Sequence, residues 1–338
     1  MKMISWNVTN MCNMRCDHCY RRANDSLQDI LQVEPPADEL TTEQAKRMIL
    51  EIKEAGFQMM IFSGGEPIMR DDLYELGRFA REMGIMPVLG TNATLITDAV
   101  AYKLRRAGFA AAGVSLDSLD AGKLSAFRKL PDCRKRIVDG IENLKKVGIR
   151  VQIHTTVMDW NLQELDALTD FAVGIGARAH HFFFLVPTGR AVQLQSEQIS
   201  PVDYERTLRW MMEKQQKVPI ELKAVCAPQF MRVADQMGVK TRFKRGCLAG
   251  ISYCIISPNG DVRPCPYLNN TLGNVKEVAF DKLWANHPIL KLLRSQDVSG
   301  KCGACDYKNQ CGGCRARAFY ETGDFMTQDP SCLYQPRG

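Results

Sequence analysis

The sequence predicts an α/β protein with a parallel sheet, followed by a small cysteine-rich C-terminal region. Two observations carry this prediction. Residues 1–190 alternate short apolar runs with longer amphipathic runs, which is the pattern of repeated strand–helix units. From Cys247 onward, cysteines, glycines and short turns replace that pattern. We therefore expect a first domain over residues 1–190, a bridging region over 191–240 and a C-terminal domain over 241–338.

The strands and helices of the first domain can be placed in order along the chain. Six short apolar runs, each bounded by glycine, proline or polar residues, are predicted strands: Met3–Val8, Gln58–Ser63, Met86–Thr91, Ala111–Ser115, Arg150–Thr156 and His180–Leu185. Amphipathic runs between them are predicted helices: Thr42–Ala55, Asp71–Met83, Thr97–Ala107, Lys135–Val147 and Leu162–Ile175. Such repeats build a parallel sheet with ligand-binding residues at the carboxyl ends of its strands. The repeat alone fits a doubly wound sheet as well as a barrel.

Fewer elements are predicted elsewhere. The bridging region is predicted to hold a helix, a short strand and a second helix: Pro201–Lys217, Pro219–Leu222 and Gln229–Met237. In the C-terminal domain, the sequence Ser-Pro-Asn-Gly-Asp from Ser257 predicts a hairpin turn between Tyr253–Ile256 and Val262–Arg263. The segment Asn24–Leu40, which contains two adjacent prolines, is predicted to be a loop or lid.

Composition limits the function classes. Hydrophobic residues make up 45% of the 338 residues and charged residues 24%, as in an ordinary globular protein. No apolar run reaches the length of a membrane span, and the first residues lack a signal-peptide core, so we expect a cytoplasmic protein with no membrane partner. The formal charge of +6 would be nearly cancelled by thiolate-bound clusters. We therefore expect no nucleic-acid partner.

Thirteen cysteines without a secretion signal favour metal or redox chemistry over disulfides. Cys12, Cys16 and Cys19 have the spacing C-x3-C-x2-C at the end of the first apolar run. Three thiolates on one tight loop can hold three corners of an iron–sulfur cube and leave one iron free to bind a small molecule. A zinc ion would need a fourth ligand close by, and His18 inside the loop is poorly placed to supply it.

A second cysteine group occupies the C-terminal domain. Its eight members are Cys247, Cys254, Cys265, Cys302, Cys305, Cys311, Cys314 and Cys332. Eight thiolates make two complete sets of four, which fit two iron–sulfur clusters or two zinc sites. Cys133 is interpreted as a plain loop thiol. Cys226 is most simply a buried small residue, but it can also serve as a hydrogen donor in an active site or replace one of the eight ligands.

The N-terminal motif resembles that of the radical S-adenosylmethionine (radical SAM) enzymes. The resemblance consists of the three-cysteine loop followed by Tyr20, and of Ser63-Gly64-Gly65-Glu66-Pro67 at the end of the second strand. It implies a partial (β/α)6 TIM-like barrel in which Cys12, Cys16 and Cys19 are catalytic and bind a 4Fe–4S cluster. SAM would chelate the open iron and be cleaved to a 5′-deoxyadenosyl radical that abstracts hydrogen from the substrate.

The same resemblance assigns further residues. It implies SAM contacts by Tyr20, Gly64, Gly65, Glu66, Pro67, Thr91, Asn92, Ser115, Asp117, Gln152, His154 and Leu185. The C-terminal block resembles the SPASM domain, which binds auxiliary iron–sulfur clusters. By that resemblance the nearer cluster would be bound by Cys247, Cys254, Cys265 and Cys314, and the outer cluster by Cys302, Cys305, Cys311 and Cys332. Two residues precede Cys314 where the SPASM family usually has three.

The substrate is predicted by resemblance only. Ile4–Asn10, Ile61–Pro67, Phe184–Ala191 and Cys311–Ala318 resemble the short radical SAM proteins of haem d1 and alternative haem biosynthesis. These remove or trim tetrapyrrole side chains, so the resemblance implies an oxidoreductase or lyase with a reductant such as flavodoxin or ferredoxin. Carboxylate partners would be Arg190, Arg315 and Arg317. A ribosomal-peptide or protein maturase, for instance one that forms thioethers, is the alternative. A zinc-binding module on a degenerate barrel is a third, non-enzymatic interpretation.

Overall fold

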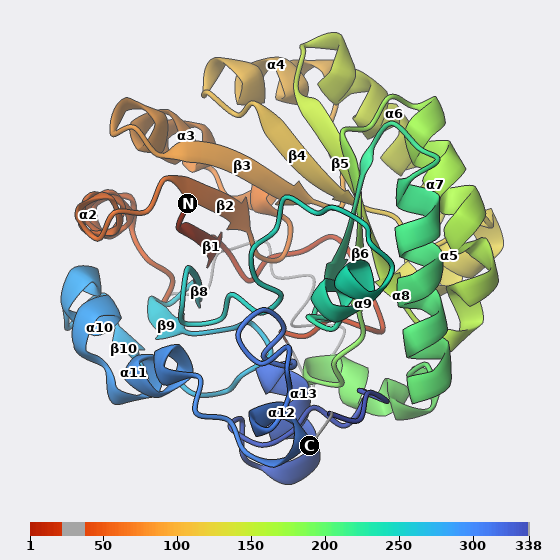
Figure 1. Cartoon of the computed structure of the whole chain (residues 1–338). Helices are drawn as coiled ribbons and strands as arrows, with labels where there is room; N and C mark the ends of the chain where they lie inside the picture. The colour runs from red at the N-terminus through yellow and green to blue at the C-terminus, as the bar shows by residue number, and fades with distance from the viewer. Residues whose placement is uncertain (22–37, 337–338) are drawn as a thin grey trace.

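One curved sheet organises the molecule. The computed structural model describes residues 1–21 and 38–336. Over those residues the sheet has ten strands in the order β10-β9-β8-β1-β2-β3-β4-β5-β6-β7. Strand β8 and strands β1 to β7 run parallel to one another, whereas β9 is antiparallel to both β8 and β10. Figure 1 shows the helices around the outside of this sheet, which is the arrangement of a partial barrel.

The elements have the following bounds. The strands are β1 (Met3–Asn7), β2 (Met59–Ser63), β3 (Met86–Thr91), β4 (Ala111–Ser115), β5 (Arg150–Val157), β6 (Ala179–Phe184), β7 (Glu221–Val225), β8 (Tyr253–Ile256), β9 (Asp261–Arg263) and β10 (Gly273–Asn274). The α-helices are α2 (Thr42–Glu54), α3 (Leu73–Glu82), α4 (Asp98–Arg106), α5 (Ala121–Arg128), α6 (Cys133–Lys146), α7 (Leu165–Gly174), α8 (Pro201–Gln215), α9 (Phe230–Gln236), α10 (Phe280–Asn286), α11 (Pro288–Ser295), α12 (Gly300–Gly303) and α13 (Arg315–Thr322). Short 3-10 turns are η1 (Pro67–Met69), η2 (Asp159–Glu164) and η3 (Gly189–Glu197).

The prediction of a parallel α/β fold with a partial barrel is confirmed. All six predicted strands of the first domain form, with ends that differ by at most one residue from those expected. Helix α5 was not predicted, because Ala121–Arg128 has only a weak amphipathic pattern. Strand β7 begins two residues later than the predicted strand of the bridging region and ends at Val225. Most of the predicted loop, residues 24–37, lies outside the described residues.

The expected bridging and C-terminal regions both contribute strands to the barrel sheet. Strand β7 pairs with β6 and forms one edge of the sheet. On the other side of β1, β8 pairs with β1, with Ile4 opposite Cys254, and β9 and β10 extend the sheet to its second edge. Figure 1 shows the C-terminal segments, in blue, on the side between these two edges. The cysteine-rich region therefore packs against the first strand of the barrel, and with it against the segment that carries the first three cysteines.

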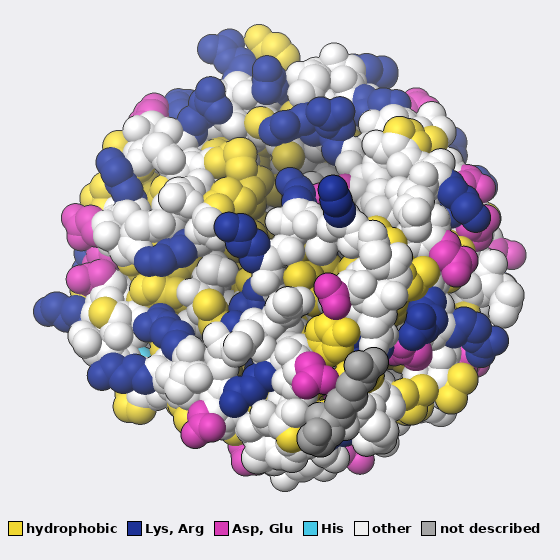
Figure 2. All heavy atoms as spheres, in the orientation of Figure 1, with side chains coloured by type: hydrophobic (Ala, Val, Ile, Leu, Met, Phe, Trp, Pro, Cys, Tyr) yellow, Lys and Arg dark blue, Asp and Glu magenta, His cyan; other side chains and the backbone are white. Residues whose placement is uncertain are grey.

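Large apolar side chains form the core between the sheet and its helices. Trp6, Phe62 and Phe109 are fully buried. The Phe62 ring packs edge to face against both of the other two rings. The guanidinium of Arg70 lies over the Trp6 ring and donates to Val8 O and Leu40 O, which fixes the chain where β1 ends. None of the described helices has the length and apolar character needed to cross a bilayer. On the face shown in Figure 2, lysine and arginine side chains are spread out and interspersed with acidic ones.

Candidate active site and auxiliary cysteine sites

The three-cysteine loop follows β1, and its thiols lie close enough to influence one another electrostatically. Burial raises the pKa of Cys12 to about 11 and that of Cys16 to about 12, and the charges of neighbouring cysteines add to both shifts. The backbone N–H of Cys19 donates to Cys16 O at 3.2 Å, which tightens the loop. Buried thiols that must ionise need a cationic partner, which the irons of a cluster provide. The donor set therefore fits a thiolate-bound cluster.

The two glycines at the end of β2 support this loop through the backbone. The N–H of Gly65 donates to Thr9 O and that of Glu66 to Met11 O, both at 2.8 Å. A Cβ on Gly65 would lie 1.7 Å from Met11 O, so only glycine fits there. Gly64 has a φ of +135°, and its Cβ would lie 2.7 Å from Thr9 O. The close approach of two backbones explains both glycines.

Glu66 ties the ends of β2 and β3 to the cysteine loop. Its buried carboxylate accepts hydrogen bonds from Thr91 Oγ1 at 2.7 Å and from the Asn92 N–H at 2.8 Å. Asn92 Nδ2 in turn donates to Asn13 Oδ1, inside the loop, at 2.8 Å. Burial raises the pKa of Glu66 to about 7, although these hydrogen bonds oppose the shift. The residues expected at these two strand ends are thus brought together.

A buried ion pair contacts the loop from the next strand. Asp117 follows β4 and Arg128 ends α5, and a guanidinium nitrogen of Arg128 donates to an Asp117 carboxylate oxygen. The other terminal nitrogen of Arg128 lies 3.8 Å from Cys16 Sγ. Burial opposes ionisation of Asp117, but the Arg128 charge outweighs it and lowers the pKa of Asp117. Arg128 was missed in the sequence, because nothing in its local pattern predicts α5 or its contact with Cys16.

The segment after β6 holds the loop from the opposite side. The Arg190 N–H donates to Cys19 O at 2.9 Å, and Arg190 Nε donates to Cys16 O at 3.0 Å. Gly189 has a φ of +61°, and a Cβ there would lie 2.4 Å from the Tyr20 backbone. Tyr20 OH donates to Asn7 Oδ1, at the end of β1, at 3.1 Å. Segments that follow β2, β3, β4 and β6 therefore all contact the loop that carries the cysteines.

The other residues expected to contact SAM lie elsewhere along the strands or in the core. Pro67 is buried and is the first residue of η1, and Ser115 is the last residue of β4. Gln152 and His154 share a face of β5, with Gly113 and Ser115 opposite them in β4. The His154 ring stacks on His181 with centroids 5.1 Å apart and covers Gly113. Leu185 is buried in a small apolar cluster with Phe127 and Met158.

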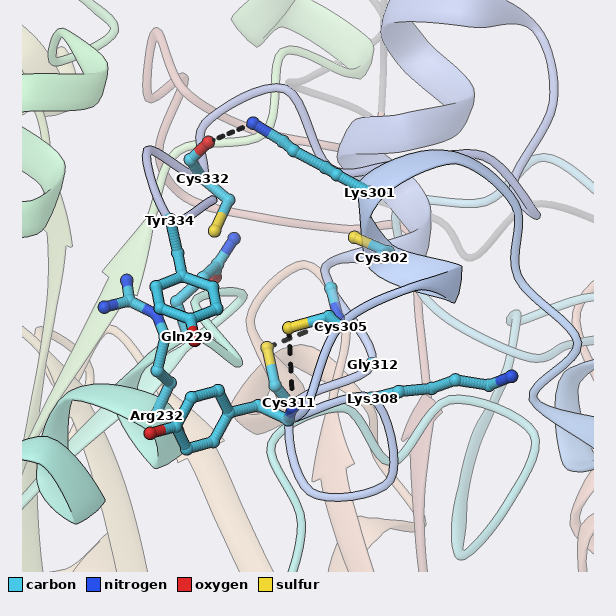
Figure 3. Close-up of a pocket in the computed structure, with 12 residues that line it drawn as sticks. Gln229, Arg232, Lys301, Cys302, Cys305, Lys308, Cys311, Gly312, Cys332 and Tyr334 are labelled. Atoms are coloured by element: carbon cyan, nitrogen blue, oxygen red, sulfur yellow. Dashed lines mark hydrogen bonds between the residues drawn. The ribbon is translucent and has the colours of Figure 1, made fainter. Parts of the chain in front are cut away.

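The outer cysteine set of the C-terminal domain converges on one cavity. Cys302, Cys305, Cys311 and Cys332 line it together with Gln229 and Arg232. Figure 3 shows the four sulfur atoms directed toward the same space. Backbone N–H groups of Tyr307, Gly313 and Asp329 donate to Cys305, Cys311 and Cys302 Sγ at 3.4, 3.5 and 3.4 Å. Four thiols with N–H donors to three of them fit a four-cysteine iron–sulfur site.

The four cysteines expected to form the inner set do not all pack in one cluster. Cys314, Cys265 and Cys226 pack into one cluster with Tyr267. Cys254 is instead fully buried in the main core between the sheet and its helices. Tyr20 and Tyr267 lie between this set and the N-terminal loop, with ring centroids 5.4 Å apart. The two sites are thus joined by a pair of aromatic rings.

The three arginines expected to bind substrate carboxylates make contacts within the protein. Arg315 Nη1 donates to Phe325 O at 2.8 Å and to Thr327 O at 2.6 Å. Arg317 donates to Cys226 O at 3.0 Å and to Leu185 O at 3.4 Å, and it lies 3.6 Å from an Asp329 carboxylate oxygen. Arg190 donates to the cysteine loop, as described above. Their hydrogen bonds to backbone carbonyls give all three a role in holding the cysteine-bearing segments.

Among the described residues, the cysteines do not form a preformed site for a single metal ion. Within the described ranges, no three His, Cys, Asp or Glu side chains lie close enough together to hold one ion. A tetrahedral zinc site needs its four ligands within about 2.3 Å of the metal.

Comparisons with known proteins agree with this chemistry. A model of the radical SAM superfamily matches residues 6–172, and a model of the iron–sulfur cluster-binding SPASM domain matches residues 247–315. The AdoMet-dependent heme synthase of Methanosarcina barkeri is 40% identical over 348 residues, which cover 99% of this chain and 97% of that protein. The chain belongs to the radical SAM superfamily. This radical SAM protein is an enzyme that uses a 4Fe–4S cluster and SAM, and its SPASM domain implies auxiliary iron–sulfur clusters.

Two further similarities extend the comparison. The pre-heme d1 synthase of Dinoroseobacter shibae is 29% identical, over 98% of this radical SAM chain and 85% of that protein. The crystal structure of Streptococcus suis SuiB bound to its precursor peptide SuiA superposes with a TM-score of 0.77 and 17% identity, over 98% of this chain and 76% of that one. At that identity the second similarity shows the fold alone.

Proposed function

We propose that this radical SAM enzyme removes or modifies carboxylate-bearing side chains of a tetrapyrrole precursor of haem. The observation that carries the proposal is the 40% identity to the AdoMet-dependent heme synthase of Methanosarcina barkeri over nearly the whole of both chains. In the superfamily, the reduced cluster and SAM supply a 5′-deoxyadenosyl radical that abstracts a hydrogen atom. The electron donor in this proposal is a flavodoxin or a ferredoxin.

The barrel residues have distinct roles in this proposal. Cys12, Cys16 and Cys19 hold the SAM-binding cluster, and Glu66 and Arg128 fix the loop that carries them. The SAM contacts are proposed at Tyr20, Gly64, Gly65, Glu66, Pro67, Thr91, Asn92, Ser115, Asp117, Gln152, His154 and Leu185. Arg190, Arg315 and Arg317 are omitted as substrate ligands, because their hydrogen bonds to backbone carbonyls hold the loops around the cysteines.

The reaction must balance in atoms and electrons. Converting a propionate to a vinyl group breaks one C–H bond and the bond to the carboxylate. The hydrogen atom goes to the deoxyadenosyl group, carbon dioxide leaves, and one electron remains. An electron acceptor is therefore required. Iron–sulfur clusters, which accept single electrons over a wide range of potentials, are the acceptor class that a SPASM domain supplies.

Anaerobic turnover with an iron tetrapyrrole that bears propionates tests the proposal. The reconstituted protein receives SAM and a reductant, and both products are measured by mass spectrometry. We expect the tetrapyrrole to lose carbon dioxide and one hydrogen per modified side chain, with one 5′-deoxyadenosine formed for each. A Cys12→Ala variant should form neither product. SAM cleavage that leaves the tetrapyrrole unchanged, without a Soret shift on mixing, would contradict the proposed substrate.

A peptide substrate is the second candidate. It is supported by the fold similarity to SuiB, which was crystallised with its precursor peptide. The same assay can decide between the two candidates. A short peptide encoded beside this protein should then change mass in the presence of SAM, while the tetrapyrrole absorption stays unaltered.

A further inference from the structure

We propose that Cys226 is the fourth protein ligand of the auxiliary iron–sulfur cluster held by Cys247, Cys265 and Cys314, and that Cys254 does not bind it. The proposal rests on the auxiliary clusters that the SPASM domain implies. It does not depend on whether the substrate is a tetrapyrrole or a peptide.

The position of Cys226 places its thiol within the inner set. It directly follows β7, at the carboxyl end of the last barrel strand, where ligand-binding residues of such folds lie. Its side chain packs in the cluster that contains Cys314 and Cys265. A Cβ on Gly246 would lie 2.5 Å from Pro228, so the chain just after Cys226 touches the residue before Cys247. Burial raises the pKa of Cys226, and the charges of Cys314, Cys265 and Cys247 raise it further, which agrees with this grouping.

Contacts from three other segments hold Cys226 in this place. Its backbone has a φ of +59°, a strained conformation for a non-glycine residue that its surroundings must impose. Arg317 in α13 donates to Cys226 O at 3.0 Å. Three residues on, Gln229 donates to Asp329, and the same carboxylate accepts the Cys314 N–H, both at 2.7 Å. This buried network fixes Cys226 relative to Cys314.

The pleat of β8 turns Cys254 away from the site. Successive side chains of a strand point to opposite faces of the sheet. Tyr253 faces the inside, where its hydroxyl donates to Ser5 Oγ at 2.9 Å and its ring lies near Tyr20 and Cys265. Cys254 therefore faces the helices, and it is fully buried in the core that includes Leu290 and Leu293 of α11. A one-residue shift in β8 would be needed to reverse these positions.

Measuring the iron content of variants can decide whether Cys226 or Cys254 is the ligand. The test uses full-length protein with Cys12, Cys16 and Cys19 replaced by alanine, which leaves the auxiliary clusters as the bound iron. This parent should hold about eight iron atoms per chain if both auxiliary clusters form. Adding Cys254→Ala should leave that number unchanged. Adding Cys226→Ala should reduce it toward about four, or convert one cluster to the three-iron form with its own EPR signal.

Matched variants guard against misfolding. Alanine and serine face the same positive φ as cysteine, so backbone strain at position 226 is unchanged. Cys226→Ser offers an oxygen ligand and should restore iron with an altered EPR spectrum, which a merely structural role would not produce. Cys133→Ala controls for loss of a buried thiol elsewhere. A Cys226→Ala protein with the iron content and EPR spectrum of the parent, or iron loss in Cys254→Ala, would overturn the proposal. A parent without auxiliary iron would overturn both it and the cluster assignment.

Discussion

Arg128 carries a buried positive charge against the cysteine loop. It is only 3% exposed, pairs with the fully buried Asp117 and lies 3.8 Å from Cys16 Sγ. A cation beside a cluster ligand stabilises the reduced, more negative state of that cluster. We therefore expect Arg128 to affect both the stability of the barrel and the reduction potential of the cluster that we propose on this loop.

Replacing Arg128 with glutamine should affect both properties. It leaves Asp117 without its cation, so we expect a loss of about 3–5 kcal/mol in the free energy of unfolding, measured by denaturant titration. The reduction potential of the N-terminal cluster, measured by EPR-monitored titration, should become more negative. The neighbouring Lys129→Gln is a matched control, because Lys129 is about half exposed in its pair with Asp17 and such pairs contribute about 1 kcal/mol or less. Equal effects of the two variants would contradict this role.

Gly189 illustrates how a turn after one strand positions the loop after another. We predict that Gly189→Ala displaces the Tyr20 backbone, because the new Cβ would lie 2.4 Å from it at a φ of +61°. Iron retained by the N-terminal cluster should fall, and the melting temperature should drop. Gly174→Ala, at an exposed helical position with open space around it, is the control and should be neutral or stabilising by up to about 1 kcal/mol. Full iron retention in Gly189→Ala would refute the clash.

A buried histidine joins two strands and a helix. His180 in β6 hydrogen-bonds Thr155 of β5 at 2.8 Å and Thr169 of α7 at 3.1 Å. Burial lowers its pKa to about 3, whereas the unfolded chain has a value of about 6.5. Below pH 6.5 the unfolded state therefore binds a proton that the folded state does not. The neutral ring therefore makes its complete contribution to stability above about pH 6.5, and this contribution is lost as the pH falls toward 3.

The His180→Gln variant should show a weaker pH dependence. Its glutamine cannot take up this proton in the unfolded state, so the slope of unfolding free energy against pH should shrink by up to about 1.4 kcal/mol per unit between pH 6 and 4. Urea unfolding of the wild type and the variant at several pH values in this window measures the difference. Parallel curves for the two proteins would show that His180 titrates normally.

At the scale of the whole molecule, one sheet runs through all three predicted regions. Strand β8 of the C-terminal region covers the edge of β1, from Met3 to Trp6. A fragment of residues 1–240 would leave that apolar edge unpaired. We predict that the fragment aggregates, as measured by size-exclusion chromatography, while the full chain does not. A monomeric fragment with unchanged thermal stability would indicate that the predicted boundary near residue 240 separates two independent folding units.

Much of the fold could be predicted because its signals are local. The strands from Met3 to Phe184 are short apolar runs with clear ends. Helix α5 was missed because Ala121–Arg128 lacks a strong apolar stripe, and Arg128 was missed with it. The sequence resemblance suggested that Arg315 and Arg317 bind carboxylates of the substrate. In the fold they are buried and donate to backbone carbonyls.

The sequence by itself determined the chemistry of this protein. Cysteine spacing and the strand-end glycines are local patterns, and they identify a radical SAM enzyme with auxiliary clusters. The tertiary structure decided which thiols meet. Spacing along the chain does not say to which face of a strand a cysteine points, or that a residue after β7 reaches a loop beyond β8. Only the tertiary structure shows that the turn at Cys226 brings its thiol beside Cys265 and Cys314, and that the pleat of β8 directs Cys254 into the core.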